Sequence, residues 1–194
     1  MRPLGTPMAT PGTFRMSRPN KSQAKENKPI FTPDWACSIS TQEEFDWFTV
    51  IDANGDANEE QGTWFWRSDV PCAVYSYSYY AYGDEVDDWL VTPGFNLKAG
   101  KTYNLTFYTT NLSTFYDDKM EVCIGTQPTG EGLSNELFTE FSVMNDEWIE
   151  NTTKFTVDHD DVYYIGFHLL EAGYMSRVSL LAFSFSAYMP AKPP

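Results

Sequence analysis

Three oxygen-bearing side chains alternate around a glycine in the stretch VIDANGDANEE, which spans residues 50–60. Asp52, Asn54 and Asp56 stand at every second position, and a loop with that spacing can fold its oxygen ligands around a hard cation such as Ca²⁺. The same residue types also build tight turns, in which Asp and Asn side chains accept hydrogen bonds from backbone amides. The sequence leaves both interpretations open, a calcium loop and a solvated turn between two strands.

The loop does not follow the EF-hand pattern. An EF-hand places its invariant glycine at the sixth loop position and a bidentate glutamate at the twelfth. Counting from Asp52, those positions hold Ala57 and Thr63. A calcium site here must therefore belong to a β-protein loop.

Ca²⁺ takes roughly six to eight oxygen ligands, so three from one loop do not complete a site. Further acids are available at Glu59 or Glu60, and at the pair Asp87 and Asp88, which the fold can bring close. We expect one aspartate of this pair to cap a turn. The predicted calcium ligands are Asp52, Asn54, Asp56 and Asp88.

Tyrosines crowd the stretch CAVYSYSYYAYG at 72–83 and fall on both faces of a predicted strand. Burying so many hydroxyls without hydrogen-bond partners costs too much free energy, so some of them face solvent. Exposed aromatic rings with a polar edge stack on sugars and anchor protein interfaces. The predicted contact surface comprises Tyr79, Tyr80 and Tyr82, with Asp84 or Glu85 as hydrogen-bond acceptors. The alternative, aromatics that line the core, fits the tryptophans better: Trp64, Trp66 and Trp89.

No catalytic constellation stands out in the sequence. It lacks a G-x-S-x-G elbow and an H-E-x-x-H motif, and its two histidines are His159, in an acidic turn, and His168, in an apolar stretch. Cys123 has apolar neighbours, which predict a buried and unreactive thiol. Paired carboxylates across a cleft would make glycoside hydrolysis the leading enzymatic alternative. We predict a protein that is not an enzyme.

Charge divides the chain into two parts. Residues 1–30 hold six basic side chains and one acidic one, a net charge of +5, whereas the remainder holds seven basic and 26 acidic side chains, a net charge of −19. A domain this acidic repels phosphate backbones, which argues against nucleic-acid binding. It suits cations, basic protein surfaces or neutral sugars.

Cysteines and apolar runs place further limits on the chain. Cys37, Cys72 and Cys123 have no metal-binding spacing and allow at most one disulfide, and we interpret them as three small core residues. No apolar run approaches the length of a membrane span, and the first residues lack the apolar segment of a signal peptide.

Composition also predicts the domain boundaries. Residues 1–30 are rich in Pro, Ser, Thr and Lys without an apolar period, so we expect a flexible basic tail or linker. Residues 31–187 form one domain, and residues 188–194 form a proline-rich C-terminal linker.

The domain has a β pattern throughout. Apolar and polar residues alternate in short stretches, separated by Gly, Pro, Asn and Asp, at intervals of about ten residues. The predicted strands lie within 45–52, 63–69, 72–83, 87–97, 101–112, 119–128, 148–158, 161–171 and 177–188. Only the stretch 129–141 is compatible with a helical turn. This arrangement predicts an antiparallel sandwich of two sheets.

These residues resemble a known family, the choice-of-anchor J or cleaved-adhesin domain. The block Asp87–Pro93, DDWLVTP, with Gly100–Tyr103 after it, carries the resemblance, and Tyr163–His168 supports it. The resemblance implies a jelly-roll sandwich of bacterial surface and secreted proteins, similar to MAM domains and to the adhesin modules of gingipains. Members of the family bind ligands without catalysing reactions, and several hold structural calcium.

One departure from the family pattern concerns calcium. The last strand of the family ends in an Asp-Asp pair that helps to hold an ion in related jelly rolls. Leu181 and Ala182 occupy that place here and offer no side-chain oxygen. That particular calcium site is therefore expected to be absent.

The sequence thus predicts a non-catalytic module of a larger exported bacterial protein, at the cell surface or secreted. Its partners would be glycans or host and matrix proteins, together with neighbouring domains, and no membrane insertion is expected. The alternatives are a structural spacer without a ligand of its own and a hydrolase that acts on glycans.

Overall fold

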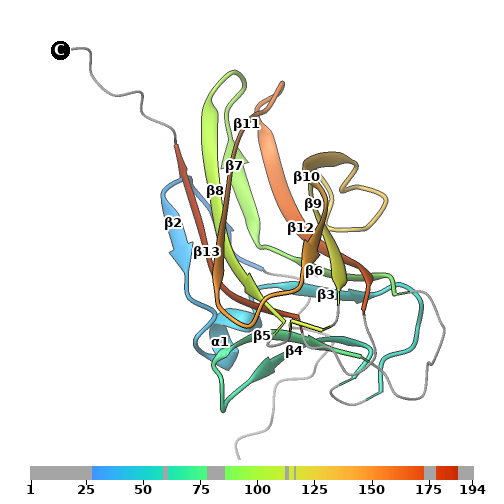
Figure 1. Cartoon of the computed structure of the whole chain (residues 1–194). Coiled ribbons are helices and arrows are strands. Elements are labelled where there is room, and N and C mark those ends of the chain that lie inside the picture. Colours follow the sequence, from blue (N-terminus) through green and yellow to red (C-terminus); the bar gives the residue numbers. More distant parts are fainter. Residues whose placement is uncertain are drawn as a thin grey trace, which may run out of the picture.

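The computed structural model describes residues 28–58, 61–77, 86–111, 114–115, 117–172 and 178–187, with the backbone alone at 181–182. Two β-sheets form a sandwich, and one short helix lies at its lower end in the view of Figure 1. The fold is an all-β jelly-roll sandwich, as the sequence predicts. The strands are β1 (Ile30–Phe31), β2 (Trp35–Cys37), β3 (Thr49–Asp52), β4 (Thr63–Arg67), β5 (Cys72–Ser76), β6 (Asp88–Val91), β7 (Gly94–Leu97), β8 (Thr102–Thr110), β9 (Asp118–Gly125), β10 (Asn135–Val143), β11 (Ile149–Thr156), β12 (Asp161–Glu171) and β13 (Ser179–Ala187).

Strands from distant parts of the chain are neighbours in both sheets. The seven-stranded sheet has the order β1-β7-β12-β6-β3, and β9 lies between β12 and β10. The six-stranded sheet has the order β11-β8-β13-β5-β4, and β2 pairs with β13. Among the described pairs, β1 and β7 run parallel and the others antiparallel. The central strands β12 and β13 therefore hold the sandwich together from the C-terminal part of the chain.

Aromatic and aliphatic side chains fill the space between the sheets. In β8 the alternation predicted from the sequence puts Tyr103, Leu105 and Phe107 in the core, each at most 2% exposed. The Phe107 ring contacts Phe167 of the opposite sheet in an edge-to-face arrangement, with 5.1 Å between ring centroids. Because side chains point to opposite faces of a strand in turn, the intervening residues of β8 face outward.

A short helix begins the segment that the sequence predicts as one strand over 45–52. Helix α1 spans Gln42–Phe45, and β3 begins only at Thr49. A capping box fixes the helix start, because Thr41 accepts from the backbone amide of Glu44 and the Glu44 carboxylate accepts from that of Thr41. The predicted strand start was therefore wrong, since the cap overrides the aromatic pattern that follows it.

The segment 129–141 holds a tight turn and then β10 rather than a helix. The Gly132 amide donates to the Thr129 carbonyl at 3.0 Å. A Cβ atom on Gly125 would lie 1.7 Å from the Gly132 carbonyl oxygen, so only glycine permits this close approach. No helical turn forms in this stretch, because β9 offers an edge on which β10 pairs.

The three cysteines are core residues, as predicted from their neighbours. Cys37, Cys72 and Cys123 are all reduced and buried. Burial raises the pKa of the Cys123 thiol to about 12 and that of Cys37 to about 11. Such thiols are poor nucleophiles at neutral pH.

Candidate metal centre

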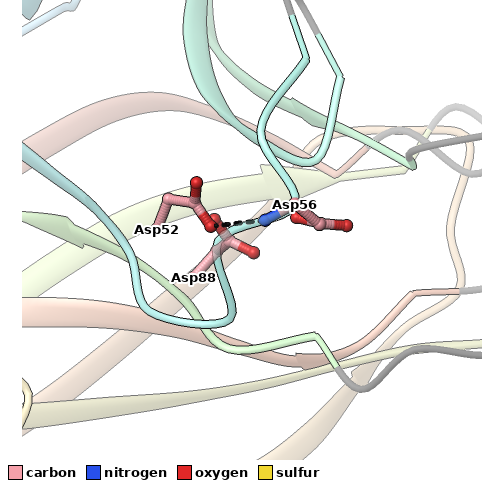
Figure 2. A group of neighbouring side chains, drawn as sticks. All are labelled: Asp52, Asp56 and Asp88. Atoms are coloured by element: carbon pink, nitrogen blue, oxygen red, sulfur yellow. Dashed lines mark hydrogen bonds between the residues drawn. The ribbon is translucent and has the colours of Figure 1, made fainter. Parts of the chain in front are cut away.

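The register of two neighbouring strands brings two predicted ligands together. Asp52 ends β3 and lies directly opposite Asp88, which begins β6. The loop that follows β3 then carries Asp56 to the same place. One carboxylate oxygen from each of Asp52, Asp56 and Asp88 lies within 4.8 Å of the others. Figure 2 shows the three side chains gathered at this point. Three of the four predicted ligands thus meet at one end of the sandwich.

The turn interpretation describes Asp52 correctly. Its Oδ1 accepts hydrogen bonds from the amides of Gly55, at 2.7 Å, and Asp56, at 3.1 Å, and its Oδ2 accepts from Ala57 at 3.1 Å. The fourth predicted ligand, Asn54, is exposed in this loop, outside the group of three carboxylates. Asp52 therefore shapes the loop whether or not an ion is bound.

The turn interpretation does not account for Asp88. Its side chain is 0% exposed, and neither carboxylate oxygen has a hydrogen-bond partner among the described residues. Its backbone carbonyl accepts from the Trp64 indole at 3.4 Å. A buried carboxylate without donors is costly unless its charge is compensated or protonated.

The pKa of Asp88 is raised by this unfavourable environment. Burial, the largest cause, raises the pKa of Asp88 to about 8. The negative charges of Asp56, Asp52 and Asp87 act in the same direction, whereas the Thr63 hydroxyl, which lies nearby outside hydrogen-bond geometry, acts weakly against them. A bound divalent cation would reverse this balance, because it favours the charged form of every carboxylate around it.

A glycine lets the loop approach the cluster closely. Gly62 has φ of +68°, and a Cβ atom there would lie 2.7 Å from both the backbone oxygen and Oδ1 of Asp56. The Gly62 amide also donates to the Ser76 carbonyl at 2.8 Å, which ties the loop to the end of β5. A side chain at this position would displace Asp56.

The acidic environment continues to residues that the sequence analysis did not select. Tyr75 is 0% exposed, and burial is the largest cause of a raised pKa for its hydroxyl, ahead of Asp88, Asp56 and Asp118. Asp118 is the first residue of β9 and is fully buried. A buried Asp at a strand start carries no signal in the sequence that separates it from a turn residue.

The chemistry of the donors fits a hard divalent cation. All three side chains offer carboxylate oxygens, with no sulfur or nitrogen in the group. Ca²⁺ binds oxygens at roughly 2.3–2.6 Å in flexible geometry, whereas Mg²⁺ requires a near-ideal octahedron at roughly 2.0–2.1 Å. An irregular group with one capped carboxylate and one buried carboxylate suits Ca²⁺ better.

The predicted ligand-contact residues lie outside the described part of the chain: Tyr79, Tyr80, Tyr82, Asp84 and Glu85. The same holds for Glu59 and Glu60. The tryptophans follow the core interpretation, since Trp64 is 2% exposed, Trp89 is 6% exposed and Trp66 is half-buried against the core.

His168, which the sequence places in an apolar stretch, belongs to a polar network on the outer face of the seven-stranded sheet. Its Nδ1 lies 2.8 Å from Glu121 Oε1, and its Nε2 lies 2.8 Å from Asp87 Oδ1. The ring stacks on Trp89, with 3.8 Å between centroids and 10° between planes. The sequence analysis missed this network, because its members come from three separate stretches.

Comparison with solved structures places this architecture. No protein-family profile and no curated protein sequence matches the chain. The K1 cleaved adhesin domain of Lys-gingipain from Porphyromonas gingivalis W83 superposes with a TM-score of 0.58 over 80% of this chain and 98% of that domain, at 15% identity. The chain has the cleaved adhesin fold. The K2 domain of Lys-gingipain gives a TM-score of 0.55 over 80% of this chain and 99% of that domain, at 17% identity.

A further solved structure extends the comparison beyond the adhesins. The N-terminal cellulose-binding domain of β-1,4-glucanase C from Cellulomonas fimi gives a TM-score of 0.51 over 79% of this chain and 95% of that domain, at 14% identity. At these identities the comparisons establish the cleaved adhesin fold alone. No described helix has the length and apolar character needed to cross a membrane.

Proposed function

We propose that this chain is a non-catalytic binding module of a larger exported bacterial protein, whose loop end is ordered by Ca²⁺ and contacts a glycan or a host or matrix protein. The observation that carries the proposal is the buried Asp88 carboxylate, which has no hydrogen-bond partner among the described residues and faces Asp52 and Asp56. A cation at this point would compensate three negative charges and join β6 to the loop after β3.

The predicted contact residues lie next to this site along the chain. The stretch 78–85 connects Tyr75, in β5, to Asp88, which begins β6. Both flanking residues belong to the acidic environment described above. An ion that fixes the start of β6 would restrict the connecting stretch and lower the entropy lost when a ligand binds.

The cleaved adhesin fold and the acidic composition support a binding role. Solved structures with this fold include adhesin domains and a cellulose-binding domain. The net charge of −19 on residues 31–194 favours neutral sugars or basic protein surfaces over nucleic acid. Export is part of the proposal, because such modules act on surfaces outside the cell.

Glycan arrays and immobilised matrix proteins, probed with Ca²⁺ and with EDTA, test this function. The double substitution Tyr79→Ala with Tyr80→Ala should reduce binding at least tenfold and leave the melting temperature nearly unchanged, since exposed rings add little to a core. Tyr108→Ala is the matched control, because Tyr108 is a partly exposed tyrosine of β8 whose hydroxyl donates to Glu150 of β11.

Two results would contradict the proposed contact surface. A double variant that unfolds would place the two rings in the core, and a double variant that binds unchanged would move the contact elsewhere. Absence of any ligand in both Ca²⁺ and EDTA would favour the spacer role.

Glycoside hydrolysis, the enzymatic alternative, needs two accessible carboxyl groups across a cleft. Asp88 has the raised pKa of a general acid, but its side chain is 0% exposed in the described structure, and a glycosidic oxygen cannot reach it. Turnover of a panel of chromogenic glycosides, abolished by Asp88→Asn, would overturn this argument.

A further inference from the structure

The network around His168 forms one cross-strand row on the outer face of the seven-stranded sheet. The register places His168 of β12 opposite Trp89 of β6 and Glu121 of β9. The imidazole is enclosed, because the indole stacks on one of its faces and carboxylates face both of its nitrogens. His168 is 8% exposed, so water competes little for these contacts.

Asp87 is the point at which this network meets the candidate metal centre. Its Oδ1 accepts from the Trp89 indole at 3.2 Å and faces His168 Nε2 at 2.8 Å. Its backbone carbonyl accepts from the amide of Ala53, at 2.9 Å, in the loop between Asp52 and Asp56. The residue is thus held at its side chain by two rings and at its backbone by the metal loop.

Asp88 follows Asp87 directly, and its side chain points to the opposite side of the strand. A displacement of Asp87 therefore moves Asp88, to which it is covalently linked, and also moves the loop that carries Asp52 and Asp56, through the hydrogen bond from the Ala53 amide. The Asp87 side chain is half-exposed, so without the ring contacts its carboxylate would be free to turn into solvent.

We propose that His168 is a positioning residue for the candidate metal centre, which holds Asp87 so that Asp88 and the loop at Ala53 keep the arrangement required for a divalent cation. The effect on metal binding rests on the proposed function, but the contacts by which His168 holds Asp87 are a property of the metal-free protein. Residues that orient metal ligands typically change metal affinity by roughly 10- to 100-fold.

The substitution His168→Phe tests the proposal, because phenylalanine keeps the stack on Trp89 and removes both ring nitrogens. We expect the dissociation constant for Ca²⁺, measured by calorimetry, to rise about tenfold. In EDTA, hydrogen exchange at the Ala53 amide should accelerate by at least about tenfold, while the core amide of Leu105 changes by less than about twofold. His159→Phe is the matched control, since His159 is exposed in the turn before β12.

The outcomes distinguish the positioning role of His168 from the existence of the cation site. Unchanged Ca²⁺ affinity together with unchanged Ala53 exchange in His168→Phe would overturn the positioning role. A wild-type protein that binds no Ca²⁺ would overturn the proposed function. Hydrogen exchange at the Ala53 amide in His168→Phe would still test whether His168 holds Asp87 in place. If His168→Phe fails to fold, Asp87→Asn replaces it, because the half-exposed Asp87 side chain tolerates the change. An Ala53 exchange rate in Asp87→Asn equal to that of the wild type would count against the proposal.

Discussion

At the scale of single residues, neighbouring aspartates have different roles that follow from their surroundings. Asp52 accepts three backbone amides and acts as the cap of a turn. Asp88 is fully buried without such donors. Asp87 contacts the ring nitrogens of two aromatic side chains on the outer face. The candidate metal centre therefore depends on Asp88, because it is the acid whose charge the described residues leave uncompensated.

Asp88→Asn should separate metal binding from folding. The neutral amide removes the repulsion from Asp52 and Asp56, so in EDTA at pH 8.5 the variant should be more stable than the wild type by on the order of 1–3 kcal/mol. Excess Ca²⁺ should raise the melting temperature of the wild type and leave that of the variant unchanged. Thermal unfolding with and without Ca²⁺ measures both effects, and an equal calcium shift in the two proteins would exclude Asp88 as a ligand.

The raised pKa of Asp88 also predicts how stability depends on pH. The value moves from 3.8 to about 8 on folding, so the folded metal-free protein binds this proton more tightly than the unfolded chain does. The contribution of Asp88 to stability is complete below about pH 4 and is lost as the pH rises to about 8. The difference in pH dependence between wild type and Asp88→Asn, measured by urea unfolding in EDTA, isolates this contribution.

Calcium should reverse that trend. The ion binds ionised carboxylates and competes with the proton on Asp88. The increase in melting temperature caused by Ca²⁺ should therefore be larger at pH 8.5 than at pH 6. A calcium shift that is constant across this range would show that Asp88 is ionised in the metal-free protein.

Among the elements, Gly62 in the loop between β3 and β4 and Gly100 in the loop between β7 and β8 meet different spatial constraints. Gly62 combines a positive φ with close contact to Asp56, whereas Gly100 has the same φ of +68° and nothing within 4 Å of its Cβ position. Both need glycine for their backbone conformation, but only Gly62 also needs the space.

Gly62→Ala and Gly100→Ala form a matched pair on this basis. Each should lose about 1 kcal/mol of stability from the strained backbone. Gly62→Ala should in addition displace Asp56 and reduce the calcium-dependent rise in melting temperature, whereas Gly100→Ala should keep it. Equal calcium responses in the two variants would show that the approach of Asp56 to Gly62 does not matter for the ion.

At the scale of the whole molecule, the first strand lies at the predicted boundary between tail and domain. Ile30 and Phe31 form β1 and pair with β7, and the Phe31 ring stacks on Trp35 at 4.7 Å between centroids. Lys28 also contacts the chain, because its Nζ donates to the carbonyl of Phe48. The described contacts thus include residues that precede the boundary expected from composition.

Truncation locates this boundary by experiment. A chain that starts at Lys28 should melt within about two degrees of the full chain, because every contact of β1 is kept. A chain that starts at Thr32 loses β1 and the Phe31 ring and should be destabilised by about 2–4 kcal/mol. Differential scanning calorimetry compares the two, and equal melting temperatures would show that β1 adds nothing to the sandwich.

The class of the fold and part of the candidate metal centre could be predicted from the sequence alone. Alternation with a period of two placed Tyr103, Leu105 and Phe107 in the core, because strand geometry is local. The spacing of Asp52 and Asp56 around Gly55 was likewise visible as a cation loop or a turn, because both depend on residues within one short stretch.

The role of each acid depends on its burial and on its partners in the packed chain. Asp88 becomes a candidate ligand because antiparallel pairing sets it opposite Asp52, and Asp118 is fully buried at the start of β9. The His168 network joins β9, β12 and the start of β6, whose network residues lie 32 or more positions apart in the chain. Burial and cross-strand register are properties of the packed chain, so no local pattern could reveal them.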